Sequence, residues 1–478
     1  MGSVRLWVIL LIVPAAVWLA STAVSSAIES DWYSMLEQQF GPLTPFDRSQ
    51  LALSEVCSDD VLSSDVPEWC RDHLIVSALQ TGSILTGIGS GALILMISVA
   101  GRLGQGDRTM LLTLFRPGLI ITLLAVTGLV GINSILAIGA IFYVLSEFMG
   151  IVFPIILLMI GLGGLIGLIV LVKAGIDILQ RASTFVIGRV ITREDSPELW
   201  RFVDSIAREM NAKSPKSIVA GLEPNFFVTE ADVQLPGSQL AGESLYISLP
   251  LCRILTLNEL HAIVAHELTH FQGEDTKFSQ DFYPIYRGAA QSLDSLSATA
   301  GESLRIIPVL PALAILSHFL DAFSIAERSI SRDREFAADR FAAQVTSGQT
   351  IGSALVKVHT FSKLWSTALE RAWYASSYRA SNASAEFADL AMLDDLQELV
   401  FSSAGETVSH PTDSHPQLGD RLKVLGVTLD DVVTDALNTQ PQSPATELIS
   451  DHSSLEEALT ELTIQLYQIA AQTSRNQP

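Results

Sequence analysis

Two histidines and a glutamate are spaced so that together they could hold and use a metal ion. The stretch Asn258–His270 reads NELHAIVAHELTH, a continuous helical pattern. Because His266 and His270 are four residues apart, both imidazoles face one side of such a helix and can bind one cation. Glu267 lies one position round from His266, where its carboxylate can reach a metal-bound water without being a ligand. The pattern predicts a hydrolytic zinc centre, whereas we assign no role to Glu259 and expect it at the surface or behind the ligands.

A second helical stretch could complete this centre. A catalytic zinc takes three protein ligands and keeps its fourth position for water and substrate, and chance His-Glu-x-x-His matches occur on solvated helices. The sequence SRDREFAADR at Ser331–Arg340 puts Glu335 and Asp339 on one helix face. Glu335 is the candidate third ligand, and Asp339 the candidate carboxylate that orients a ligand histidine. Alternatively, Glu335 pairs with a neighbouring arginine on an exposed face.

These two stretches and a later SHPQLGDR at Ser414–Arg421 occur in the order of one known family. Over roughly Arg189–Leu425, the chain resembles the integral-membrane gluzincins, which include the CAAX prenyl proteases and the bacterial heat-shock membrane proteases. The resemblance implies one zinc ion held by His266, His270 and Glu335, with Glu267 as the general base.

The resemblance also implies residues near the substrate. It places His415 and Arg421 there, and His415 could donate a hydrogen bond to the developing oxyanion. Arg421 either does the same or holds the His-Pro turn. His410 also precedes a proline in an SHP sequence, but it lacks the downstream arginine and ranks below His415.

In this family the substrate binds as an added strand at the edge of a small sheet, where main-chain pairing gives affinity with little side-chain selectivity. Here the expected edge strand is Ser244–Leu249, with Tyr246 and Ser248 as candidate substrate-binding residues. Asn225, in the sequence PNFF, matches a family segment that lines the cleft.

The first part of the chain is built for a membrane. The sequence is 49% hydrophobic and only 17% charged, which is unusual for a soluble enzyme. Four apolar segments are long enough to cross a bilayer as helices, at about 6–24, 81–100, 119–145 and 151–172. The first could instead be a cleaved signal peptide, but its apolar stretch is longer than a usual signal core, which favours a retained anchor.

Basic residues predict the orientation of these spans. Arginines and a lysine cluster at 101–117 and after residue 172, so both segments should be cytoplasmic and the segment 27–80 external. The catalytic domain would then lie on the cytoplasmic side of the plasma (inner) membrane. Cys57 and Cys70 lie in the external segment, where a disulfide is plausible, the alternative being two free thiols. Cys252 stands alone and is expected to be a small core residue.

The fold class expected from these patterns is mainly α, with four transmembrane helices followed by an α+β zincin-type metallopeptidase domain with a small sheet. The division is 1–180 for the membrane domain, 181–425 for the peptidase domain and 426–478 for an acidic tail. The tail is interpreted as an appendage with one helix from Ser454, where Ser454 and Glu457 form a capping-box pattern.

One apolar run departs from the family pattern. The heat-shock proteases are usually drawn with paired spans between the zinc helix and the glutamate helix, whereas only the short run 306–320 lies there. A single crossing would put His270 and Glu335 on opposite sides of the membrane. We therefore expect a buried or interfacial helix at this position.

The function predicted from the sequence is a membrane-anchored zinc endopeptidase that cleaves membrane or misfolded proteins at the cytoplasmic face. A zinc-binding scaffold or chaperone without significant proteolysis is the alternative, although an intact Glu267 argues against it. A transporter-like protein would need functional charges within the spans, and the four apolar segments contain none. The net charge of −22 argues against a nucleic-acid partner. The oligomeric state is left open.

Overall fold

The computed structural model describes residues 3–57, 67–104, 108–179, 184–271, 286, 288, 310–376, 381–393, 396–404 and 416–475. The chain forms two compact units. Unit 1 comprises residues 1–180 and 285–326, and unit 2 comprises residues 181–284 and 327–478.

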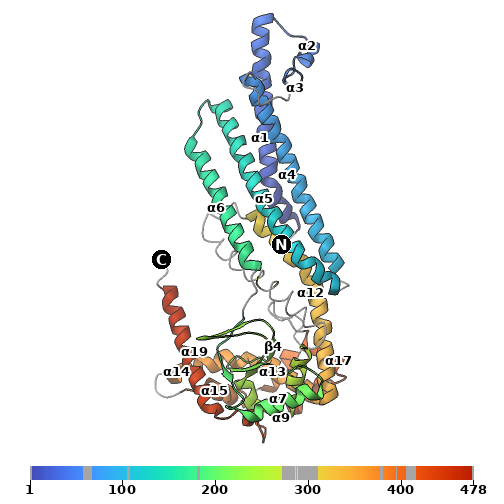
Figure 1. Ribbon diagram of the computed structural model, residues 1–478, viewed down its shortest axis with the longest axis vertical. Helices are drawn as coiled ribbons and strands as arrows, with labels where there is room; N and C mark the ends of the chain where they lie inside the picture. The colour runs from blue at the N-terminus through green and yellow to red at the C-terminus, as the bar shows by residue number, and fades with distance from the viewer. Residues whose placement is uncertain are drawn as a thin grey trace. The chain divides into compact units, whose positions relative to one another are not determined.

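Four long helices make up most of unit 1, and neighbours in the chain pack side by side (Figure 1). They are α1 (Ser3–Phe40), α4 (Glu68–Gly104), α5 (Arg108–Met149) and α6 (Pro154–Leu179). Each is long and apolar enough to cross a membrane, and together they contain the four predicted spans. In their most apolar windows only 18% to 33% of the residues are buried, so most of these apolar side chains need a hydrocarbon environment. The prediction of four membrane helices is confirmed.

The segment predicted as an external loop is largely helical. α1 continues to Phe40, the short helices α2 (Pro45–Gln50) and α3 (Leu53–Val56) follow, and α4 starts at Glu68. Cys57 and Cys70 form the predicted disulfide. Beside it the rings of Trp32 and Trp69 stack with centroids 4.0 Å apart, which gives this end of unit 1 its own small core.

The apolar run between the two ligand stretches forms the first part of α12 (Leu310–Val345). Ile315, Phe319 and Phe323 are buried, and Phe319 packs on Phe115 of α5 with ring centroids 5.6 Å apart. Gly101 of α4 approaches α12 so closely that a Cβ there would lie 2.8 Å from the Ala322 side chain. The expected buried helix is therefore present over residues 310–320. It groups with the long helices of unit 1, while α12 continues into unit 2.

Unit 2 contains two small sheets. The four-stranded sheet has the order β2 (Gly188–Ile191), β3 (Ser217–Gly221), β7 (Ser244–Ser248) and β4 (Phe227–Thr229). β3 and β7 are parallel, whereas β2 and β4 run antiparallel to their neighbours. The three-stranded sheet has the order β1 (Thr184–Phe185), β5 (Val233–Leu235) and β6 (Ser238–Leu240).

The position of β7 corrects the expected edge strand. β7 pairs with β3 along its whole length and with β4 over Ser244–Tyr246, so it is an inner strand. All five of its residues are buried, because neighbouring strands cover its edges and packed side chains cover both faces. The edge on this side of the sheet is β4.

Helices pack on one face of the four-stranded sheet and share one core with it. The first of them, α7 (Pro197–Glu209), buries Leu199, Val203 and Ile206. The other elements are α8 (Leu249–Ile254), α9 (Leu257–Thr269), α13 (Gly348–Phe361), η3 (Ser362–Leu364), α14 (Trp365–Ser376), α15 (Ala383–Leu390), α16 (Leu396–Ala404), α17 (Leu418–Val424), α18 (Leu429–Ala436), η4 (Ala445–Leu448) and α19 (His452–Arg475).

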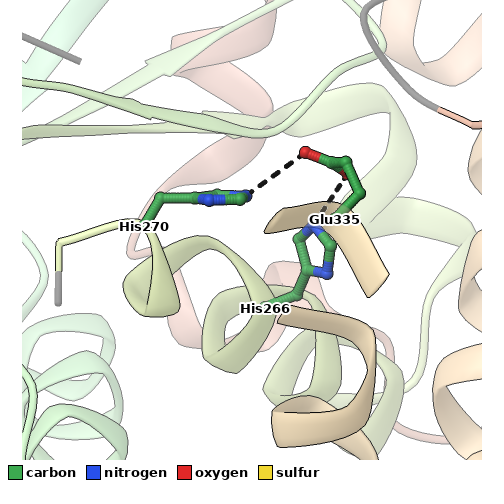
Figure 2. Close-up of side chains that lie close together, drawn as sticks. All are labelled: His266, His270 and Glu335. Carbon is green, nitrogen blue, oxygen red and sulfur yellow. Dashed lines mark ion pairs between the residues drawn. The ribbon is translucent and has the colours of Figure 1, made fainter. Parts of the chain in front are cut away.

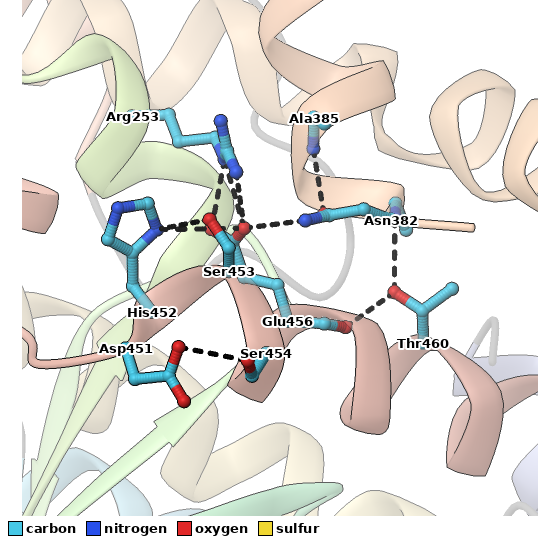
Figure 3. A network of polar contacts seen from close by, with 10 residues as sticks. Arg253, Asn382, Ala385, Asp451, His452, Ser453, Ser454, Glu456 and Thr460 are labelled. Atoms are coloured by element: carbon cyan, nitrogen blue, oxygen red, sulfur yellow. Dashed lines mark hydrogen bonds and ion pairs between the residues drawn. The ribbon is translucent and has the colours of Figure 1, made fainter. Parts of the chain in front are cut away.

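The acidic tail is part of unit 2, so its interpretation as a one-helix appendage is wrong. α18 and α19 both contribute to the core, through residues such as Val432 and Leu459. Glu456 of α19 is fully buried and accepts hydrogen bonds from Arg253 of α8 (Nε–Oε1, 2.9 Å) and from Asn382 at the start of α15 (Figure 3). Because α19 starts at His452, Ser454 lies inside its first turn rather than at a cap.

Candidate metal centre

α9 presents the histidines from a helix that is fixed at its start and along its buried face. The Thr256 hydroxyl accepts a hydrogen bond from the Glu259 amide, and the Glu259 carboxylate accepts one from the Thr256 amide, which is a capping box. Leu260, Val264 and Leu268 are fully buried at helical spacing. His266 lies in the last turn of α9, and His270 is its C-terminal cap residue.

The second half of α12 brings Glu335 to these histidines, as Figure 2 shows. Glu335 Oε2 lies 3.4 Å from His266 Nε2, and Glu335 Oε1 lies 3.5 Å from His270 Nε2. One ligand atom from each residue falls within 4.8 Å of the others. Zinc bound tetrahedrally about 2.1 Å from each donor would separate the donors by about 3.4 Å. The donor set and its spacing therefore fit a single zinc ion.

Asp339 and Arg421 support this group from behind. Asp339 is fully buried one turn after Glu335, and its Oδ1 lies 3.0 Å from His266 Nδ1. Arg421 of α17 donates hydrogen bonds to both Asp339 oxygens, from Nε at 2.8 Å and from Nη2 at 2.6 Å. Arg421 Nη2 also lies 3.7 Å from Glu335 Oε2. Arg421, which was predicted near the substrate, thus has the buried carboxylates of Asp339 and Glu335 as its partners.

The charges in this network favour the ionised carboxylate of Asp339. Burial by itself raises the pKa of Asp339, but the charge and hydrogen bonds of Arg421, together with His266, lower it to about 2. Burial likewise lowers the pKa of His266, but the carboxylates of Asp339 and Glu335 outweigh burial and raise it above its ordinary value. A histidine binds metal only as the neutral base, so a cation at this centre replaces that proton.

The predicted general base and the predicted oxyanion donor differ in what the structure describes of them. Glu267 is 8% exposed and follows His266 on α9. His415 lies outside the described residues, as does His410.

Tyr246, Ser248 and Asn225 have polar contacts within the fold. The Tyr246 hydroxyl accepts a hydrogen bond from the Glu223 amide at 2.9 Å, and its ring stacks on Phe227. Ser248 caps α8, and Asn225 Oδ1 accepts from the Phe226 amide at 2.9 Å. A role for these three in substrate binding remains a prediction.

A buried polar cluster around Lys357, which contacts the start of α9, was not predicted. Lys357 of α13 is fully buried, and its Nζ donates to Glu259 Oε2 (2.9 Å) and to the carbonyl oxygens of Ile254 and Asn438. Ser353 donates to Glu259 Oε1 at 2.7 Å. Glu259 therefore anchors the start of α9 from a buried position. The signal for its cap was in the sequence, since Thr256 and Glu259 have capping-box spacing.

Comparison with known families agrees with this geometry. Residues 194–428, which include His266, His270 and Glu335, match Peptidase family M48. This region, just under half of the chain, is an M48-like peptidase domain. M48 is a metal-dependent peptidase family, and the cluster on α9 and α12, which could hold a metal ion, lies within the matched residues.

Several relatives of this chain carry the name Protease HtpX homolog. The protein from Pyrococcus furiosus is 28% identical over 182 residues, which is 36% of this chain and 59% of that protein. The protein from Archaeoglobus fulgidus is 27% identical over 254 residues, covering 51% of this chain and 71% of the relative. The protein from Ralstonia nicotianae is 29% identical over 178 residues, or 36% and 59%. No solved structure matches the chain.

The match to the Pyrococcus and Ralstonia proteins thus spans 59% of their length. This match supports the family. The four apolar helices support a membrane protein.

Proposed function

We propose that this M48 protein is a membrane-anchored zinc endopeptidase. The observation that carries the proposal is the meeting of His266, His270 and Glu335, from two helices far apart in the sequence, with Glu267 next to the first ligand. Two histidines and a glutamate are the ligand set of catalytic zinc sites that keep one open position. Zinc bound there would polarise a scissile carbonyl and lower the pKa of a bound water.

The protein's own side chains then transfer the protons and stabilise the negative charge of the intermediate. Glu267 takes the proton from the attacking water and delivers it to the leaving amine nitrogen. His415 donates a hydrogen bond to the oxyanion of the tetrahedral intermediate. Asp339 keeps His266 in the tautomer whose Nε2 faces the metal, and Arg421 holds Asp339 in place.

A polypeptide substrate pairs with the edge of the four-stranded sheet. β4 is the outer strand next to β7, and it contacts the metal helix α9. An extended peptide that hydrogen-bonds along β4 would gain affinity from main-chain groups and place few demands on side chains. Such low selectivity suits a protease for membrane or misfolded proteins, which we infer are the substrates.

We infer that the protein lies in the plasma (inner) membrane and that its catalytic domain faces the cytoplasm. The support is the cluster of basic residues between the second and third spans and after the fourth. The segment that contains the Cys57–Cys70 disulfide is then external, in the compartment where disulfides persist.

The decisive experiment compares the purified full chain with Glu267→Gln. Bound zinc is counted by elemental analysis, and cleavage of casein and of a membrane protein is followed by gel. The variant should keep about one zinc per chain and lose at least about 100-fold in cleavage, because general-base catalysis is removed while the ligands remain. Glu198→Gln, on the exposed surface of α7, is the matched control. Equal cleavage by the wild type and Glu267→Gln would reject the endopeptidase and favour a zinc-binding scaffold.

A further inference from the structure

Unit 1 contains a half-open cavity of about 670 Å³ among its helices. α1, α4, α5, α6 and the first turns of α12 all contribute to its wall. The wall is mostly aliphatic, with residues such as Leu10, Val13, Val130, Ala137, Ile160 and Ile315. All of these elements belong to unit 1, so the cavity lies within one compact unit.

Small residues line the cavity where α5 faces α6. Gly163 and Gly164 of α6 line the cavity and project no side chains into it. A Cβ at Gly164 would lie 2.7 Å from Ser134 Oγ of α5, so the two helices are already in close contact at this point. The hydroxyls of Ser90 and Ser134 donate to the carbonyls of Thr86 and Val130 in their own helices. These serines therefore add little polarity to the wall.

Asn133 of α5 is the polar exception. It alone carries an amide among the lining residues, and it is half-buried. Its Oδ1 is buried and has no hydrogen-bond partner among the residues that the structure describes. An unsatisfied polar group is costly in a hydrocarbon environment, and polar residues within membrane helices commonly mark binding sites. The terminal amide torsion is soft, so Asn133 can turn either an acceptor or a donor towards a bound molecule.

We propose that this cavity binds the hydrocarbon chain of one amphiphile, and that Asn133 hydrogen-bonds a hydroxyl or amide which that molecule carries. The surrounding spans place the cavity where hydrocarbon chains are the available solvent. A membrane-spanning helix is too large to be the occupant, because a cylinder about 10 Å wide and 30 Å long has a volume of roughly 2,400 Å³. A cavity of a few hundred Å³ suits a small ligand with an apolar body and a single polar group.

The test uses a 16-carbon alcohol that carries a photoreactive diazirine on its chain. The full-length protein is reconstituted in phosphatidylcholine vesicles with this probe, irradiated, and mapped by peptide mass spectrometry. Label should concentrate on the cavity wall, at peptides containing Ala137 and Met159, and excess unlabelled hexadecanol should compete for it. Ala137→Phe fills the cavity and should lower this labelling at least about fivefold. Ile135→Phe is the control, because Ile135 is 70% exposed on the same helix.

The role of Asn133 is tested with a second variant and a second probe. Asn133→Leu preserves the size of the side chain and should lower labelling by the alcohol about fivefold, the effect of one lost hydrogen bond. Labelling by a diazirine alkane of the same length should not change. Unchanged alcohol labelling in Asn133→Leu would overturn the role of Asn133. Label spread evenly over exposed apolar side chains, without competition and unaffected by Ala137→Phe, would overturn the site itself. Neither readout depends on peptide cleavage.

Discussion

The two halves of α12 are buried by opposite chemistries. The first half buries Ile315, Phe319 and Phe323 against other apolar side chains of unit 1. The second half buries the carboxylates of Glu335 and Asp339 in unit 2. Apolar side chains gain free energy simply by leaving water, whereas a buried carboxylate requires specific partners. The first half should therefore tolerate other apolar shapes at its buried positions, whereas the buried carboxylate positions of the second should tolerate almost no substitution.

The largest effect is expected for Glu335→Gln in the second half. The amide has nearly the same shape but is a poor zinc ligand, so bound zinc should fall from about one to near zero per chain. Cleavage should fall at least about a thousandfold, since metal catalysis supplies several kcal/mol. Zinc content and casein cleavage are measured together. Asp333→Asn on the exposed face of the same helix should change neither, and full zinc occupancy in Glu335→Gln would remove Glu335 from the ligand set.

Arg421→Met should destabilise unit 2 strongly, because it removes the cation that faces the buried half of α12. It leaves Asp339 buried with its main cation removed, which typically costs about 3–5 kcal/mol. Denaturant unfolding of the full chain in micelles, followed by the fluorescence of Trp200 in the core of unit 2, measures the loss.

The double variant Arg421→Met, Asp339→Leu sharpens this test. It removes both charges, so it should regain most of the lost stability while binding zinc more weakly than the wild type. If the double variant is as unstable as Arg421→Met, the cost does not come from an unpaired Asp339.

Phe319→Ala changes the apolar half of the same helix. Loss of its contacts with Phe115 and Phe323 should destabilise unit 1 by about 3 kcal/mol, as a large-to-small core substitution does. Thermal unfolding in micelles measures the loss. Phe319→Leu should recover most of the stability, and neither variant should change the zinc dissociation constant. A weaker zinc site in Phe319→Leu would contradict the separation between the two halves.

The sequence was sufficient where a pattern is local or chemically strict. Four apolar runs predicted the four long helices, and the spacing of His266 and His270 predicted two neighbouring imidazoles at the end of one helix. Cys57 and Cys70 could be paired because both lie in one short polar segment. Each of these inferences depends on neighbours in the chain or on a ligand type that a metal requires.

Pairing between distant segments could not be predicted. The apolar run in Ser244–Ser248 suggests a strand but does not distinguish an edge strand from an inner one, and the Tyr246 hydroxyl is satisfied by the backbone at Glu223. The composition of the tail suggested an appendage. It could not reveal that the tail packs on unit 2, because the partner of Glu456 is Arg253, 203 residues earlier. The contact between Arg421 and Asp339 also crosses 82 residues. Long-range polar contacts of this kind leave no periodic signal in the sequence.

The smallest effect is expected for Asp339→Asn, which tests whether Asp339 only supports the ligand His266 or is itself essential for metal binding. Asp339→Asn keeps the shape of the side chain and removes the negative charge beside His266 Nδ1, while His266, His270 and Glu335 remain. Loss of such a supporting carboxylate typically weakens metal affinity about 10–100-fold, much less than loss of a ligand. Competition with a chelator measures the zinc dissociation constant, and saturating zinc should restore most of the cleavage in this variant. Glu335→Gln should not recover under the same conditions. If neither variant recovers, Asp339 acts as a fourth essential group rather than as the support of His266, and if both recover, Glu335 is not a ligand.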